Sequence, residues 1–125
     1  MKRMGRARLL SIAMLPMLAV LPSQDRAQEP APDRRIEIVA ERFSYFPSRI
    51  RVRRGTTVEF VLTSDDTYHG FFMPQFGVNL MIQPPGKDAT TVRVTFSEAG
   101  EYVFECSRPC GAGHNTMRGV VVVEE

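Results

Sequence analysis

Residues 106–117 read CSRPCGAGHNTM, so two cysteines, a histidine and a methionine follow one another at the spacing C-x3-C-x3-H-x2-M. Cys106 and Cys110 are the only cysteines of the chain, and His114 is one of its two histidines. Thiolate and thioether sulfurs are soft ligands that select copper over magnesium, calcium or manganese. The small residues at 111–113 allow the backbone to fold closely around an ion. The run therefore predicts a metal-binding loop.

The second histidine, His69, lies far upstream of this loop. It follows the polar turn TSDDTY at 63–68 and begins the short aromatic segment HGFFM at 69–73. With the loop it makes a set of two thiolates, two imidazoles and one thioether. Because bound thiolates are deprotonated and bound imidazoles are neutral, metal uptake by this set would release protons.

The segments around these residues alternate polar and apolar side chains, which is the signature of half-buried strands. Glycine and proline separate them, and no window of the body has helical apolar spacing. About eight short strands in this arrangement predict an all-β fold, a two-sheet antiparallel sandwich with Greek-key connections. The expected strands are 35–40, 50–52, 57–63, 69–73, 78–82, 90–96, 101–106 and 119–123.

Charge is distributed unevenly along the 125 residues. The formal net charge is +2, but residues 1–27 hold five basic side chains and one acidic one. The remaining chain has 11 basic and 13 acidic groups, and is therefore slightly acidic. This body lacks the basic surface that nucleic-acid binding requires, so we expect no nucleic-acid partner.

The N-terminus has the organisation of a targeting segment. Residues 1–8 are basic, residues 9–21 are a 13-residue mostly apolar run, and a polar stretch follows. This order predicts a signal peptide over 1–27, with Ala27 as the last residue removed. A retained short membrane anchor is the alternative, although a span needs about 20 apolar residues. We expect a linker over 28–34, a folded domain over 35–125, and an exported protein in the periplasm or anchored outside the inner membrane.

Three stretches together resemble a known family, the CuA domain of cytochrome c oxidase subunit II, which is a cupredoxin. They are FSYFPSRIRVRRG at 43–55, HGFFMPQFG at 69–77, and the loop at 106–117. The resemblance spans roughly residues 36–124 and implies a cupredoxin-like fold. The loop is its most specific part, because both residue type and spacing match.

This resemblance implies a centre of two copper ions that passes single electrons. The implied ligands are bridging Cys106 and Cys110, capping His69 and His114, and the weak ligands Met117 and the backbone carbonyl of Arg108. In the family, electrons arrive from a cytochrome c or a similar redox protein and leave for a haem of the oxidase catalytic subunit. No catalysis is expected from the chain alone, and association with the membrane stays open.

Two departures from the family pattern bear on partners. Arg108 stands where the family usually has a carboxylate or amide side chain, which affects docking but not a carbonyl ligand. The chain also has no tryptophan, an aromatic that many members place where electrons arrive. Phe71, Phe72 and Phe76 are the candidates to replace it.

Other readings of the same residues remain open. Cys106 and Cys110 suit a disulfide in an oxidising compartment, and two cysteines with two histidines suit structural zinc. A mononuclear blue-copper site would use His69, Cys110, His114 and Met117, with Cys106 as a bystander. A periplasmic protein that stores or delivers copper is the alternative function.

Overall fold

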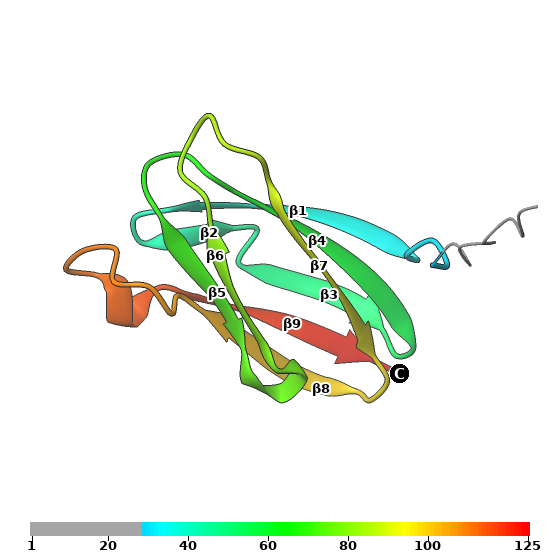
Figure 1. Cartoon of the computed structure of the whole chain (residues 1–125). Coiled ribbons are helices and arrows are strands. Elements are labelled where there is room, and N and C mark those ends of the chain that lie inside the picture. Colours follow the sequence, from blue (N-terminus) through cyan, green and yellow to red (C-terminus); the bar gives the residue numbers. More distant parts are fainter. Residues whose placement is uncertain (1–28) are drawn as a thin grey trace, which may run out of the picture.

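The computed structural model describes residues 29–125, and these form a sandwich of two β-sheets with two short 3₁₀ helices (Figure 1). The predicted signal peptide or anchor lies outside the described residues. Within 29–125, no helix has the length and apolar character needed to cross a membrane. The elements are β1 Arg34–Glu41, β2 Ser44–Phe46, β3 Arg49–Arg53, β4 Thr56–Ser64, β5 His69–Met73, η1 Pro74–Phe76, β6 Val78–Ile82, β7 Thr90–Phe96, β8 Gly100–Glu105, η2 His114–Thr116 and β9 Arg118–Glu124.

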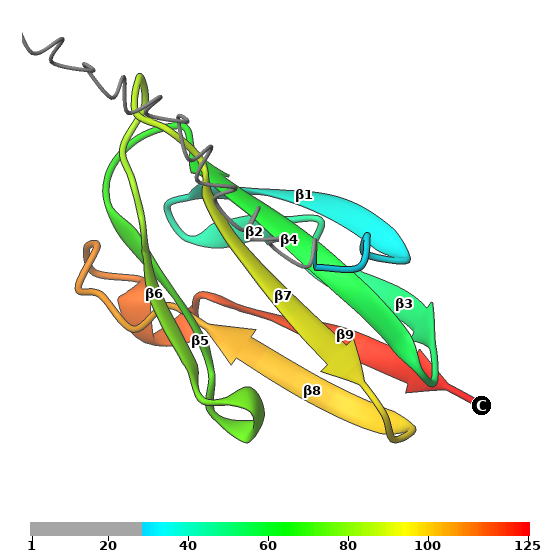
Figure 2. The ribbon, with the colours of Figure 1, turned by 45° about the vertical axis from the view of Figure 1, so that its right-hand side comes forward.

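The strands divide into a four-stranded sheet, in the order β2-β1-β4-β7, and a five-stranded sheet, in the order β3-β9-β8-β5-β6. Figure 2 shows β1, β4 and β7 in one layer and β8 and β9 in the other. The predicted all-β, two-sheet architecture is confirmed, and all eight expected strands are present. β2 was not predicted, because a segment of three residues is too short to show alternation.

The prediction of purely antiparallel sheets is wrong for two strand pairs. β1 lies parallel to β4, and β3 lies parallel to β9. Alternation of polar and apolar residues tells which face a side chain occupies, but it contains no information on strand direction. Both sheets are therefore mixed.

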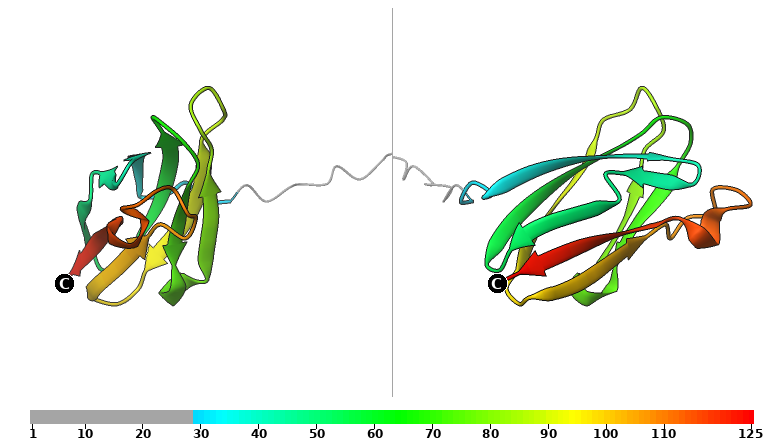
Figure 3. Two further views of the ribbon diagram at one scale, coloured as in Figure 1. Left: turned by 90° about the vertical axis from the view of Figure 1, so that its left-hand side faces the viewer. Right: turned by 180° about the vertical axis from the view of Figure 1, so that it is seen from behind.

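Aromatic side chains fill the space between the sheets. Tyr45, Phe60, Phe71, Phe96 and Phe104 are all fully buried, and neighbouring rings lie 5.0–6.4 Å apart between centroids. The inward-facing aromatic residues of the strands thus build a rigid core. The loop between β8 and β9 extends from one end of this core, and both the N-terminal end of β1 and the C-terminal end of β9 lie at the other end (Figure 3).

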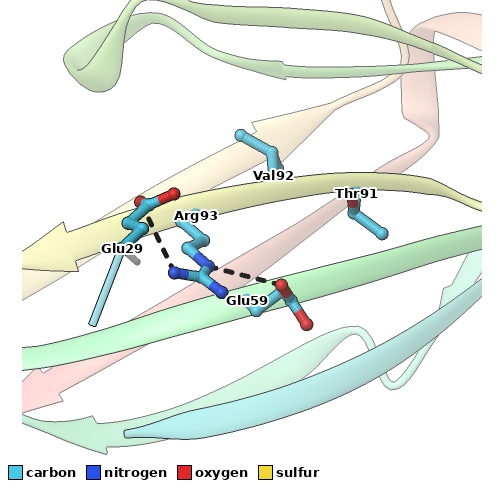
Figure 4. A pocket seen from close by; sticks show the side chains of 5 residues that line it. All are labelled: Glu29, Glu59, Thr91, Val92 and Arg93. Atoms are coloured by element: carbon cyan, nitrogen blue, oxygen red, sulfur yellow. Dashed lines mark hydrogen bonds and ion pairs between the residues drawn. The ribbon is translucent and has the colours of Figure 1, made fainter. Parts of the chain in front are cut away.

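On the outer face of the four-stranded sheet, charged side chains hold the first described residues in place. Arg93 of β7 contacts Glu59 of β4 at 3.3 Å and Glu29 at 3.4 Å (Figure 4). It also donates a 2.8 Å hydrogen bond to the carbonyl of Pro30. Residues 29 and 30 are thereby fixed on this face, away from the β8–β9 loop.

Candidate metal centre

The predicted metal-binding loop connects the antiparallel strands β8 and β9, which pair up to Glu105 and Arg118. The backbone N–H of Cys106 donates to the carbonyl of Met117 at 3.1 Å and closes the loop at its base. η2 forms the last turn before β9. Rigid strands on both sides hold the donor atoms in position, which favours a preorganised site.

The two cysteine side chains meet inside this loop. Their Sγ atoms lie 3.7 Å apart, and both side chains are buried free thiols. A disulfide has an S–S bond of about 2.0 Å, so the described geometry is that of two adjacent thiols. Burial, followed by the hydrogen bond with Cys106, raises the pKa of Cys110 to about 11. The Cys110 thiol, buried beside a second thiol and with a raised pKa, stays protonated when no cation is near, and a bound cation would stabilise its thiolate form.

His69 reaches these sulfurs from the beginning of β5. Its side chain is fully buried, and a ring nitrogen lies within 4.8 Å of both Sγ atoms. Nε2 contacts Asp66 Oδ1 at 2.7 Å, whereas Nδ1 is buried without a hydrogen-bond partner. A buried polar atom with no partner costs free energy unless something occupies it. An imidazole with an unpaired Nδ1, close to two thiols, therefore fits a metal ion.

The other predicted site residues approach Cys110 and Cys106. His114 Nδ1 lies 3.7 Å from Cys110 Sγ, and Met117 Sδ lies 3.9 Å from the same sulfur. The carbonyl of Arg108 lies 3.1 Å from Cys106 Sγ, while its side chain is exposed. All six residues predicted from the sequence thus gather at one end of the sandwich.

Asp66 is a site residue that the sequence analysis missed. Burial opposes its ionisation, but hydrogen bonds from His69 and from the backbone N–H groups of Arg42 and Thr67 prevail and lower its pKa to about 2. The ionised carboxylate accepts a hydrogen bond from the Nε2–H group of His69, which leaves Nδ1 without a proton and free to bind. Such a partner fixes the tautomer and orientation of a ligating histidine. The sequence offered one indication of this role, because Asp66 lies in a polar turn only three residues before His69.

Backbone groups around the sulfurs were also missed. Gly70 N–H donates to Cys106 Sγ at 3.3 Å, and Arg42 Nε donates to the carbonyl of Cys110 at 2.6 Å. Tyr45 donates its phenolic proton to the carbonyl of Gly70 at 2.6 Å. Burial, and then the nearby cysteines, raise the pKa of Tyr45, so this phenol stays a donor throughout the neutral range.

Two of the three candidates for an aromatic residue at the surface near the metal, Phe71 and Phe76, are wrong, whereas Phe72 is half-buried and pairs with Glu105 just before the loop. Phe71 is fully buried in the core, and Phe76 packs against Phe96 and Tyr102 beyond the other end of β5. Tyr68 is exposed and lines a pocket together with Arg108 and Pro109 of the loop. The ring of Phe43 also contacts the loop. A Cβ atom added to Gly113 would lie 2.4 Å from its Cδ2 atom, so the ring and the loop backbone are in direct contact.

A family model for the cupredoxin-like domain matches residues 10–123. This chain belongs to the cupredoxin-like family. The family accounts for the two-sheet all-β fold, as the resemblance implied.

Among individual cupredoxin-like proteins, cytochrome c oxidase subunit 2 of Thermus thermophilus is 38% identical over 90 residues, which cover 72% of this chain and 65% of the relative. The probable subunit 2 of Rickettsia prowazekii is 33% identical over 85 residues, 68% of this chain and 26% of the relative. The chain thus spans less than two thirds of the length of these relatives, and it is homologous to part of them.

The solved structures that resemble this chain also include oxidase proteins. A chain of a heme-copper terminal oxidase dimer has a TM-score of 0.66 and 28% identity, covering 74% of this chain and 65% of that one. The periplasmic domain of cytochrome oxidase subunit II from Bradyrhizobium japonicum has a TM-score of 0.69 at 19% identity, covering 77% of this chain and 87% of that one. The second likeness is one of fold.

Proposed function

We propose that this cupredoxin-like protein transfers single electrons through a centre of two copper ions. The observation that carries the proposal is the pair of buried sulfurs 3.7 Å apart, with an unpaired His69 nitrogen near them. A mononuclear site would leave Cys106 idle, yet Cys106 lies between Cys110, the Gly70 N–H and the Arg108 carbonyl. Soft sulfur ligands and homology to oxidase subunits both favour copper as the metal.

The residues have distinct tasks in this function. Cys106 and Cys110 hold both ions, His69 and His114 hold one each, and Met117 and the Arg108 carbonyl are weak ligands. Held by these residues, the two copper ions would supply a site for one-electron transfer. The chain itself supplies fixed geometry through the β8–β9 hairpin and a buried environment for the sulfurs.

Homology to cytochrome c oxidase subunit 2 also supports a place in a respiratory chain. The protein associates with a haem-copper oxidase and accepts electrons from a cytochrome c or a similar donor. This assignment puts the domain outside the cytoplasm, in agreement with the export signal predicted for residues 1–27. Within such an oxidase the chain accepts electrons, and the chemistry of oxygen belongs to another subunit.

Copper reconstitution with metal counting and electron paramagnetic resonance tests this function. We expect two copper ions per chain, with hyperfine structure spread over both nuclei. A stoichiometry of one with a blue-copper spectrum would assign a mononuclear site, and a colourless zinc protein would remove electron transfer altogether. Ready loss of copper from the reduced protein to a moderate chelator would favour copper delivery instead.

The substitution Cys106→Ser tests the bridging role directly. A serine hydroxyl at this position is a hard, protonated ligand, so we expect the copper content to fall from two ions to one and the mixed-valence spectrum to disappear. Met117→Leu is the matched loop variant, because it removes only a weak thioether ligand and should keep both ions. A wild-type spectrum in Cys106→Ser would contradict the proposed role.

A further inference from the structure

The pairing between β5 and β8 ends one step before the metal loop. The two strands pair at Phe72 and Glu105, and beyond Glu105 the chain turns into the loop. Gly70, two residues before Phe72, is buried and has no strand partner on that side. Its N–H donates instead to Cys106 Sγ at 3.3 Å, and its carbonyl accepts from the Tyr45 hydroxyl at 2.6 Å. The Cys106 sulfur and the Tyr45 hydroxyl thus replace the backbone hydrogen bonds that Gly70 would make if the pairing of β5 with β8 continued.

Only glycine fits at this position. A Cβ atom on Gly70 would lie 2.3 Å from Ser107 Oγ and 2.5 Å from the Ser107 backbone nitrogen, so the loop backbone packs directly on β5. Glycine, however, is the residue whose backbone is least restrained by its own structure. Pairing with Met81 of β6 holds Gly70 on one side, so the hydrogen bond to Cys106 on the other side depends on a further contact that fixes the backbone there.

Tyr45 provides that contact from the opposite sheet. It belongs to β2, pairs with Ala40 of β1, and sends its fully buried side chain across the sandwich to Gly70. Its ring packs edge-on against Phe104 at 5.1 Å and Phe71 at 6.4 Å between centroids. The phenol is thus held in one place by the core, and a chain of contacts leads from Tyr45 through Gly70 to Cys106.

We propose that Tyr45 is a positioning residue that raises the reduction potential of the copper centre by holding the Gly70 N–H on the Cys106 sulfur. This inference rests on the proposed function. Reduction adds negative charge to the metal–sulfur unit, and an N–H donor to sulfur stabilises that charge. When the phenol is absent, the glycine backbone relaxes, the N–H···S hydrogen bond weakens, and the potential falls.

The test compares Tyr45→Phe with Tyr102→Phe in the copper-loaded protein. The two changes are chemically identical, because Tyr102 also donates to a backbone carbonyl, that of Glu98 at 2.8 Å, but lies away from the loop. We expect unchanged copper content in both variants and a lower reduction potential in Tyr45→Phe alone. We also expect faster hydrogen exchange of the Gly70 amide in Tyr45→Phe, measured by NMR on the copper-free protein. Equal potentials and equal Gly70 exchange in the two variants would overturn the proposal.

A second measurement keeps the proposal testable if Tyr45→Phe does not fold. Incorporation of 3-fluorotyrosine makes the phenol a stronger donor, so the potential should rise. The rise should persist in labelled protein that carries both Tyr68→Phe and Tyr102→Phe, in which Tyr45 is the one tyrosine left. No rise in the labelled protein would overturn the role of Tyr45. The Gly70 exchange measurement needs no copper, so its outcome is separate from the copper count that tests the proposed function.

Discussion

Asp66 shows how one side chain prepares a ligand. Its carboxylate lies 2.7 Å from His69 Nε2 and also accepts hydrogen bonds from two backbone N–H groups. These contacts keep the carboxylate ionised and place the imidazole proton on Nε2. Nδ1 is then the nitrogen available to a metal, without any rearrangement of the ring.

We expect Asp66→Ala to weaken copper binding by about 10- to 100-fold, because the tautomer and orientation of His69 are no longer held. Asp66→Asn retains an acceptor oxygen and should have a smaller effect. Competition titration with a copper chelator measures both variants. Asp65→Ala removes the adjacent exposed carboxylate and is the matched control. If Asp65→Ala and Asp66→Ala weaken binding equally, general loop charge rather than His69 orientation is responsible.

The thiol of Cys110 makes copper binding depend on pH. Burial raises its pKa to about 11, so the copper-free protein holds this proton at neutral pH and must release it on metal uptake. Copper affinity should therefore increase with pH from 6 to 8, by about tenfold per unit for each proton displaced. Titrations at pH 6, 7 and 8, corrected for the chelator's own protonation, check the slope. A flat profile would mean that the thiol is already ionised before copper binds.

At the scale of elements, the loop depends on close packing between its glycines and the segment that joins β1 and β2. The Phe43 ring contacts Gly111 and Gly113 directly, and Arg42 donates to the Cys110 carbonyl. The β1–β2 connection is therefore a support for the metal loop, although it contributes no ligand.

The variant Gly113→Ala tests this support. Its backbone φ of −92° suits any residue, so the only obstacle is the Phe43 ring 2.4 Å from the new Cβ atom. We expect a loss of about 1–3 kcal/mol in unfolding free energy, measured by chemical denaturation. In a Phe43→Leu background the same change should cost less, and the double-mutant cycle gives the coupling. Ala112→Ser, at an exposed neighbouring residue, is the control and should change the unfolding free energy little. If the effects of the Gly113 and Phe43 substitutions simply add, packing of the Phe43 ring on Gly113 does not support the loop.

The elements also show what a sequence can and cannot predict. The alternating segments identified eight strands because each has one face against the core. The same alternation could not reveal the parallel pairings of β1 with β4 and β3 with β9. Five of the six predicted site residues could be recognised because they lie together in residues 106–117, and His69 because it is the other histidine of the chain. Tyr45 and Gly70 were not, because 25 residues separate the phenol from its acceptor and the contact crosses between sheets.

At the scale of the whole molecule, the loop between β8 and β9 and the N-terminal end of β1 lie at opposite ends of the sandwich (Figure 3). Arg93 fixes residues 29 and 30 on the outer face of the four-stranded sheet. The loop end is therefore unobstructed by this segment. Arg108, exposed at that end, then contributes directly to the charge that a docking protein meets.

The substitution Arg108→Glu should change association with a redox partner and leave the metal spectrum intact. The proposed ligand is the backbone carbonyl, which any side chain retains, whereas the charge above the site changes by two units. With a basic cytochrome c as donor, we expect association at low salt to become faster by up to about tenfold. The gain should disappear as salt shortens the screening length to about 8 Å at physiological ionic strength. Stopped-flow reduction across a salt series measures this. The control is Arg53→Glu, which makes the same charge change at an exposed residue of β3 near the opposite end of the sandwich. An equal acceleration in this variant would show that the net charge of the protein, and not the surface of the loop, governs docking.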